Sequence, residues 1–237
     1  MLILSLDSTA KTASAALSDG ETFLGGVTLN IGNKHSTTLL PAAKFVLDQA
    51  GVSANDVEMF ALTAGPGSFT GVRIGAATVK GLSLGRSVPC IGVSSLEVMA
   101  EGIACVDGIV CPMINARRDR YFTAFFSAES GKVTRLTEDD TIEGERIREY
   151  LSTQERAVYL LGDGAEMFLE KYSDTKAVLI SEAIRYPMAY YAGVIAKRIY
   201  DSASDAERKG YTAEALRPEY LRQPQAEREL QERINNN

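Results

Sequence analysis

The chain has 237 residues, of which 45% are hydrophobic, and its formal net charge at pH 7 is −6. This length and apolar content suffice for one large domain or for two small lobes. The acidic balance argues against a chain that binds nucleic acid unaided, because phosphate contacts need clustered lysine and arginine, but it leaves open nucleic acid held mainly by a partner.

The first half of the chain alternates strand-like and helix-like segments. Short apolar or alternating runs bounded by turn residues predict strands, whereas apolar residues that recur at helical spacing predict helices. We expect strands at 2–7, 13–17, 22–29, 57–63 and 88–93, and helices at 38–50, 70–84 and 95–103. Pro41 fits the first of these helices only if the helix begins near Thr37 or Thr38, since first-turn amides have no intrahelical partner.

The second half repeats this order of three strands followed by helix, strand and helix. We expect strands at 108–114, 121–128, 132–136, 157–161 and 177–180, and helices at 143–151, 165–172 and 188–202. The repetition predicts an α/β fold with two lobes, residues 1–104 and 105–204, each a mixed sheet flanked by helices. Residues 205–237 are polar and charged, which predicts a partly flexible segment with a short helix at 225–234.

A glycine-rich segment between a predicted strand and a predicted helix carries a family resemblance. Residues 64–75 read Ala-Gly-Pro-Gly-Ser-Phe-Thr-Gly-Val-Arg-Ile-Gly. Together with residues 4–9, 35–41 and 217–222, this segment resembles the bacterial TsaB family of the actin-like ATPase superfamily, which includes Hsp70 and the sugar kinases. The resemblance implies two actin-like lobes and a role in making threonylcarbamoyladenosine in transfer RNA.

The resemblance further implies a non-catalytic, activating subunit. TsaB proteins pair with TsaD, a catalytic paralogue that holds the metal and transfers the threonylcarbamoyl group, and the ATPase TsaE joins them. The modified adenosine lies next to the anticodon in transfer RNAs that read codons beginning with A. Transfer RNA would therefore meet this chain mainly through the complex.

In that family the two proteins associate through helices that match 38–50 and 70–84 here. Without the partner, the same surface could form a homodimer with two-fold symmetry. A wide apolar stripe on such a helix cannot be divided between core and interface from sequence. The expected interface residues are Leu39, Ala43, Val46, Leu47, Val72, Gly75, Ala76 and Val79.

The metal ligands of TsaD are missing from this chain. TsaD carries a His-x-x-x-His pair, and the matching positions here are Ser95 and Met99. Neither side chain replaces an imidazole ligand, and the one histidine, His35, lies far away in sequence, so we expect no metal site. A peptidase is disfavoured as well, because a serine or cysteine nucleophile needs a nearby base.

Two turns resemble the nucleotide-binding elements of actin-like ATPases, although both also occur as plain turns between a strand and a helix. The turn that resembles the first phosphate element consists of Asp7, Ser8 and Thr9, and the turn that resembles the adenosine loop consists of Gly162, Asp163 and Gly164. The glycine-rich segment lacks the Gly-Lys-Ser/Thr ending of a P-loop, which favours a structural turn there. We expect no cofactor beyond weak or vestigial nucleotide binding.

Arginines replace the second phosphate turn of the superfamily. That turn normally contains glycine, whose bare backbone approaches the phosphates, whereas Arg117, Arg118 and Arg120 stand here. These arginines are either solvated or in contact with the partner or the transfer RNA. The alternative function is an ATP-dependent small-molecule kinase with Asp7 as its metal-anchoring carboxylate.

Sequence features also bear on location. Residues 1–10 show no basic start followed by an apolar core, and no apolar run is long enough to cross a bilayer. The cysteines Cys90, Cys105 and Cys111 form no C-x-x-C pair, which favours free thiols in a reducing compartment. We therefore expect a cytoplasmic protein without a membrane anchor.

Overall fold

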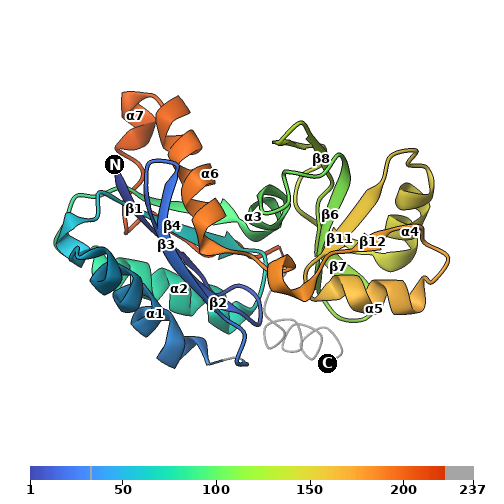
Figure 1. Ribbon diagram of the computed structural model, residues 1–237, viewed down its shortest axis with the longest axis horizontal. Coiled ribbons are helices and arrows are strands. Elements are labelled where there is room, and N and C mark those ends of the chain that lie inside the picture. The colour runs from blue at the N-terminus through green and yellow to red at the C-terminus, as the bar shows by residue number, and fades with distance from the viewer. Residues whose placement is uncertain (33, 222–237) are drawn as a thin grey trace, which may run out of the picture.

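The computed structural model describes residues 1–32 and 34–221 and has two lobes that lie side by side (Figure 1). The first lobe contains a five-stranded sheet in the order β3-β2-β1-β4-β5. Its elements are β1 (Leu2–Asp7), β2 (Ala13–Asp19), β3 (Thr22–Leu29), α1 (His35–Ala50), η1 (Ala54–Asp56), β4 (Met59–Gly65), α2 (Phe69–Leu82), β5 (Cys90–Ser94) and α3 (Ser95–Glu101).

The second lobe contains a seven-stranded sheet with the path β10-β7-β6-β11-β12, from which β8 and β9 branch beside β6. The remaining elements are β6 (Gly108–Asn115), β7 (Arg120–Thr123), β8 (Phe126–Glu129), β9 (Lys132–Arg135), β10 (Asp140–Glu143), α4 (Gly144–Ser152), β11 (Val158–Leu161), α5 (Gly164–Lys171), β12 (Val178–Leu179), η2 (Glu182–Ile184), α6 (Ala189–Ser202) and α7 (Asp205–Arg208). The predicted fold of two α/β lobes with helix-flanked sheets is confirmed.

Strand β1 is the centre of the first lobe, because it pairs antiparallel with β2 and parallel with β4. Successive side chains of a strand point to opposite faces of the sheet. Leu4 and Leu6 accordingly pack in the core under α1 and α2, whereas Ile3 packs on the opposite face with residues of α6. Both faces of β1 are therefore covered, as its continuous apolar run predicts.

The placement of α6 corrects the predicted lobe boundary. Although α6 lies within residues 105–204, its Ala192 and Ile195 pack against Ile3 and Met59 of the first sheet. Without α6 the second face of that sheet would expose its apolar side chains, so the chain crosses back to cover it. Part of the predicted tail follows the same lobe, since Leu216 is buried in the first-lobe core. The helix predicted at 225–234 lies outside the described residues.

Most predicted elements differ from the structure by two residues or fewer at an end, whereas two elements differ by more. The strand predicted at 121–128 is divided into β7 and β8, which pair with opposite halves of β6. Helix α1 begins at His35, so Pro41 lies inside it rather than in its first turn. Thr37, whose carbonyl oxygen the missing amide of Pro41 would have bonded, is exposed, and water can take the place of that amide. Within residues 1–32 and 34–221, no helix is long and apolar enough to cross a bilayer.

Candidate functional site

The glycine loop between β4 and α2 packs directly on the chain that leaves β1. The Ser68 N–H donates to the Thr9 carbonyl oxygen at 2.7 Å, and the Ser8 hydroxyl donates to the Gly71 carbonyl oxygen at 2.9 Å. A Cβ at Gly71 would lie 1.9 Å from the Ser8 carbonyl oxygen, and one at Gly67 would lie 2.4 Å from the Thr9 carbonyl oxygen. Only glycine permits this approach, so the loop uses these positions to pack against its own backbone.

Asp7 lies at the end of β1 and is completely buried. Its Oδ1 accepts hydrogen bonds from the Thr9 hydroxyl at 2.7 Å and from the Thr9 N–H at 3.3 Å. Its Oδ2 has no well-formed hydrogen bond among the described residues, and neither does the Thr63 hydroxyl, although this hydroxyl lies close enough to favour the charged form of Asp7. Burial raises the pKa of Asp7 to about 7, and the Thr9 groups oppose that rise. Ser8 and Thr9 are buried as well, so the turn that resembles the first phosphate element is covered.

The positions that match the TsaD histidine pair serve packing in this chain. Ser95 donates its hydroxyl proton to the Pro66 carbonyl oxygen, and Met99 is buried in the core between α3 and the second sheet. His35 is buried at the start of α1, and burial lowers the pKa of its imidazole. Across residues 1–32 and 34–221, no three His, Cys, Asp or Glu side chains are placed to hold a metal ion.

A contact between the lobes, which the sequence does not predict, involves the turn between β1 and β2. Lys11 of this turn pairs with Glu182 of η2, with 2.9 Å between Nζ and Oε1, and its ammonium lies 4.7 Å from the centre of the Tyr186 ring. Asn30 also donates to the Glu182 carboxylate, at 3.3 Å. The segment that resembles a phosphate element is thus bonded to the second lobe.

The turn predicted as an adenosine loop packs against the end of β6. Gly162 has a φ of 85°, and a Cβ there would lie 2.1 Å from the Met113 carbonyl oxygen. A Cβ at Gly164 would lie 2.8 Å from the Tyr121 ring. Asp163 accepts a hydrogen bond from the Asn115 N–H at 3.1 Å. Contacts within the lobe therefore account for both glycines and for the aspartate between them.

The three arginines of the β6–β7 turn differ in their surroundings. Arg117 and Arg118 are exposed at the tip, where both have positive φ, 66° and 54°. Arg120 is half-buried and pairs with Glu143 at 2.5 Å. Asp119 fixes the turn, because its Oδ2 accepts the Tyr172 hydroxyl proton at 2.7 Å. Arg117 and Arg118 are thus the more exposed of the three arginines, and contact of this turn with another molecule stays a prediction.

The prediction of the interface residues is wrong in its choice of helix face. All eight residues are buried within the first lobe, namely Leu39, Ala43, Val46, Leu47, Val72, Gly75, Ala76 and Val79. The apolar stripe on each helix covers the lobe's own sheet, since that burial is what holds the helix in place. The large apolar side chains that do face solvent here are Leu40 (51% exposed), Phe45 (54%), Phe69 (36%) and Leu84 (83%).

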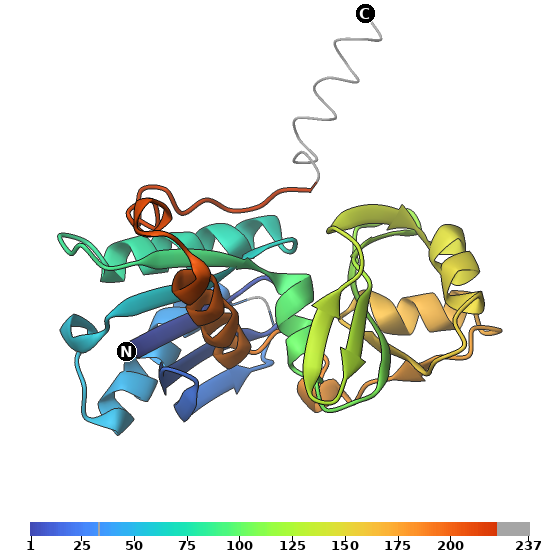
Figure 2. The same cartoon turned by 90° about the horizontal axis from the view of Figure 1, so that it is seen from above.

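A second exposed feature joins α2 to residues 211–221, which run along this helix (Figure 2). The Arg73 guanidinium lies 3.7 Å from the centre of the Phe69 ring, and its Nε donates to the Tyr220 hydroxyl at 2.8 Å. The Glu219 N–H donates to the Ala64 carbonyl oxygen at 2.8 Å, and a Cβ at Gly65 would lie 2.5 Å from the Glu219 carbonyl oxygen. The glycine segment and the C-terminal motif are thus parts of one packed unit.

Comparisons with known proteins agree with this geometry. Residues 22–230 match the model of the family TsaD, described as tRNA N6-adenosine threonylcarbamoyltransferase. The protein named tRNA threonylcarbamoyladenosine biosynthesis protein TsaB from Bacillus subtilis is 27% identical over 96% of each chain. The protein of the same name from Escherichia coli is 29% identical over 94% of this chain and 95% of its own.

A solved structure has the same fold. YeaZ from Pseudomonas aeruginosa superposes with a TM-score of 0.77 at 25% identity, covering 93% of this chain and 99% of its own. The resemblance that the sequence motifs predict is confirmed by these matches.

Proposed function

The chain belongs to the TsaD family and acts in the biosynthesis of threonylcarbamoyladenosine in transfer RNA, and we propose that it does so as a non-catalytic partner of a TsaD-type paralogue. The observation that carries this proposal is the likeness to two TsaB proteins over nearly the whole of every chain compared.

The surroundings of Asp7 support a non-catalytic role. A kinase of the actin-like type needs a carboxylate that reaches a metal ion, whereas Asp7 is completely buried and its Oδ1 is bonded to Thr9. The pKa of about 7 leaves a large part of this carboxyl protonated at neutral pH, and a protonated carboxyl is a poor metal ligand. We therefore favour the partner role over the kinase alternative, for which ATP turnover by the isolated chain would be the decisive sign.

The outer faces of α1 and α2 are the proposed docking surface. The two helices contact each other and cover the same face of the first sheet (Figure 1). Leu40 and Phe45 on α1 and Phe69 on α2 are exposed apolar side chains that a partner could cover. A paralogue with the same fold would present an equivalent helix pair, so that the two pairs could pack as a four-helix bundle. The same surface would support a homodimer when the partner is absent.

The other assignments complete the proposal. A TsaE-type ATPase would join the complex, which would act in the cytoplasm. Transfer RNA would be held mainly by the complex, with Arg117 and Arg118 as candidate contacts because they project from the β6–β7 turn. No cofactor is assigned to this chain.

Reconstitution tests the proposal directly. Transfer-RNA modification is measured with the TsaD-type and TsaE-type partners and a supply of threonylcarbamoyl-adenylate, with and without this chain. We expect modification to depend on the chain; a full rate without it would refute the activating role.

Variants locate the docking surface. Phe45→Asp should abolish co-elution with the TsaD-type partner, whereas Val178→Asp in β12 of the second lobe should not, although the two wild-type side chains are 54% and 52% exposed. Both variants should remain folded by circular dichroism. Equal co-elution of both variants would remove α1 from the interface.

A further inference from the structure

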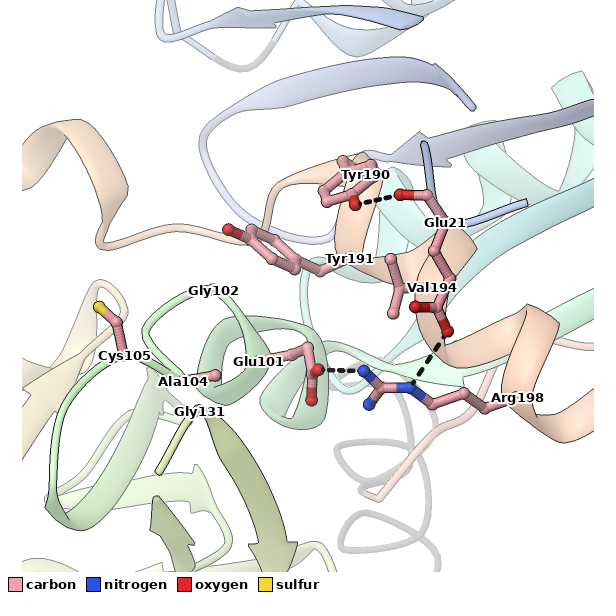
Figure 3. A pocket seen from close by; sticks show the side chains of 10 residues that line it. All are labelled: Glu21, Glu101, Gly102, Ala104, Cys105, Gly131, Tyr190, Tyr191, Val194 and Arg198. Carbon is pink, nitrogen blue, oxygen red and sulfur yellow. Dashed lines mark hydrogen bonds and ion pairs between the residues drawn. The ribbon is translucent and has the colours of Figure 1, made fainter. Parts of the chain in front are cut away.

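A pocket of about 390 Å³ lies where the two lobes meet (Figure 3). Glu21 in the turn between β2 and β3 lines one part of it, and Glu101 at the end of α3 lines another. Helix α6 contributes Tyr190, Tyr191 and Arg198. Gly131, in the turn between β8 and β9, lines the pocket from the second lobe. None of these residues takes part in the function proposed above.

Two carboxylates of the pocket share one guanidinium. The Glu101 side chain is only 8% exposed, and it forms an ion pair with Arg198, with 2.8 Å between Oε1 and Nη2. Arg198 Nε lies 4.0 Å from Oε1 of Glu21, so the same guanidinium also faces the second carboxylate. Two negative charges against one positive charge leave the pocket with an excess of negative charge, which attracts cations. Arg198 itself is half-exposed and can move without unpacking the core.

Tyrosine rings form the other side of the pocket. The ring centres of Tyr190 and Tyr191 are 5.1 Å apart in an edge-to-face arrangement. The Tyr190 hydroxyl donates to the Glu21 carbonyl oxygen at 2.6 Å, which fixes this ring beside the carboxylates. The faces of such rings carry partial negative charge and attract ammonium groups.

We propose that this pocket binds a small organic cation, namely a primary alkylammonium. The ammonium group would donate to the carboxylates of Glu101 and Glu21, and the alkyl chain would lie against the Tyr191 ring. The volume is within the range of small-molecule sites. Because the lining comes from both lobes, a bound cation would also stabilise their relative arrangement.

The test uses the full chain alone, so it does not depend on the partner role. Binding of n-butylammonium is measured by calorimetry and by NMR shifts at low ionic strength, with butyrate as the anionic counterpart. We expect saturable binding of n-butylammonium and none of butyrate. Absence of saturable n-butylammonium binding, or preferential binding of butyrate, would overturn the proposal.

Three variants test which side chains hold n-butylammonium. Arg198→Met should tighten n-butylammonium binding, because it removes the cation that competes for both carboxylates; weaker binding in this variant would contradict the proposal. Tyr191→Leu should weaken binding by about threefold, because the alkyl chain loses its contact with the aromatic ring. Glu101→Gln should weaken it by about tenfold, and Glu149→Gln, at an exposed position of α4, is the matched control.

If Glu101→Gln does not fold, the first two variants still decide the question, since neither removes a fully buried charge.

Discussion

Asp7→Asn tests whether a buried carboxyl that forms no ion pair with the described residues destabilises the first lobe at neutral pH. The pKa of Asp7 is raised from 3.8 to about 7, so the folded protein holds a proton that the unfolded chain releases between these two pH values. Below about pH 4, Asp7 therefore does not lower the free energy of unfolding. As the pH rises towards 7 this free energy falls, and above pH 7 it stays lower by a constant amount. A gap of about 3 pH units corresponds to a loss on the order of 4 kcal/mol.

Asparagine does not ionise, so it removes this pH-dependent loss of stability and keeps the shape of the side chain. Its carbonyl oxygen can accept the two hydrogen bonds that Thr9 donates to Asp7 Oδ1, and its amide can donate to the unpartnered Thr63 hydroxyl. At pH 4 the aspartic acid is neutral as well, so the variant and the wild type should have similar free energies of unfolding. At pH 8 the variant should be the more stable of the two, by up to about 4 kcal/mol.

Urea unfolding followed by circular dichroism between pH 4 and pH 8 measures this difference. Asp48→Asn is the control, because Asp48 is an exposed partner of Lys44 and its loss should change stability by less than about 1 kcal/mol. Parallel pH profiles for Asp7→Asn and the wild type would refute the reasoning. So would a variant that is less stable at pH 8, since that result means that the charged carboxylate is stabilised in the fold.

The remaining predictions concern packing. Gly71→Ala should destabilise the chain by about 3 kcal/mol or more, since its Cβ would collide with the Ser8 carbonyl oxygen, whereas Gly81→Ala, where the added methyl group meets open space, should be neutral or stabilising in thermal denaturation. Leu39→Asp should prevent folding and leave the chain insoluble, but Leu40→Asp should give soluble, folded protein by size-exclusion chromatography, because only the first side chain is buried. Tyr220→Ala should speed proteolysis of residues 211–221 relative to Tyr220→Phe, which keeps the ring against Phe69; equal cleavage rates would mean that the ring does not anchor this segment.

The sequence predicts the elements of the first lobe well because their periodicities are strong. The strands at 2–7 and 22–29 have the bounds of β1 and β3, and the helix at 70–84 differs from α2 by two residues or fewer at either end. The strand at 121–128 is less well predicted, since an apolar run gives no sign that its two halves pair with different parts of β6. The lobe to which α6 belongs depends on contacts distant in sequence, which no local pattern contains.

The candidate site was only partly predictable for a related reason. The apolar stripes of α1 and α2 correctly indicate two packed helices, but Leu39 and Leu40 are chemically identical neighbours, and only the fold decides that Leu39 is buried and Leu40 exposed. The pairing of Lys11 with Glu182 joins residues from the two lobes and leaves no local signal. Motif resemblance therefore identified the family while the orientation of each side chain required the structure.

The close contacts of the glycine segment fill the space that a phosphate would occupy in a nucleotide site. In a nucleotide site, bare backbone at Gly67 and Gly71 would lie open to phosphate oxygens. Here the space in front of these glycines is taken by the carbonyl oxygens of Thr9 and Ser8. The same loop starts α2, whose Ser68 side chain accepts a hydrogen bond from the Gly71 N–H. In this chain the loop geometry therefore fixes the start of α2 and leaves no backbone open to a phosphate at these two glycines.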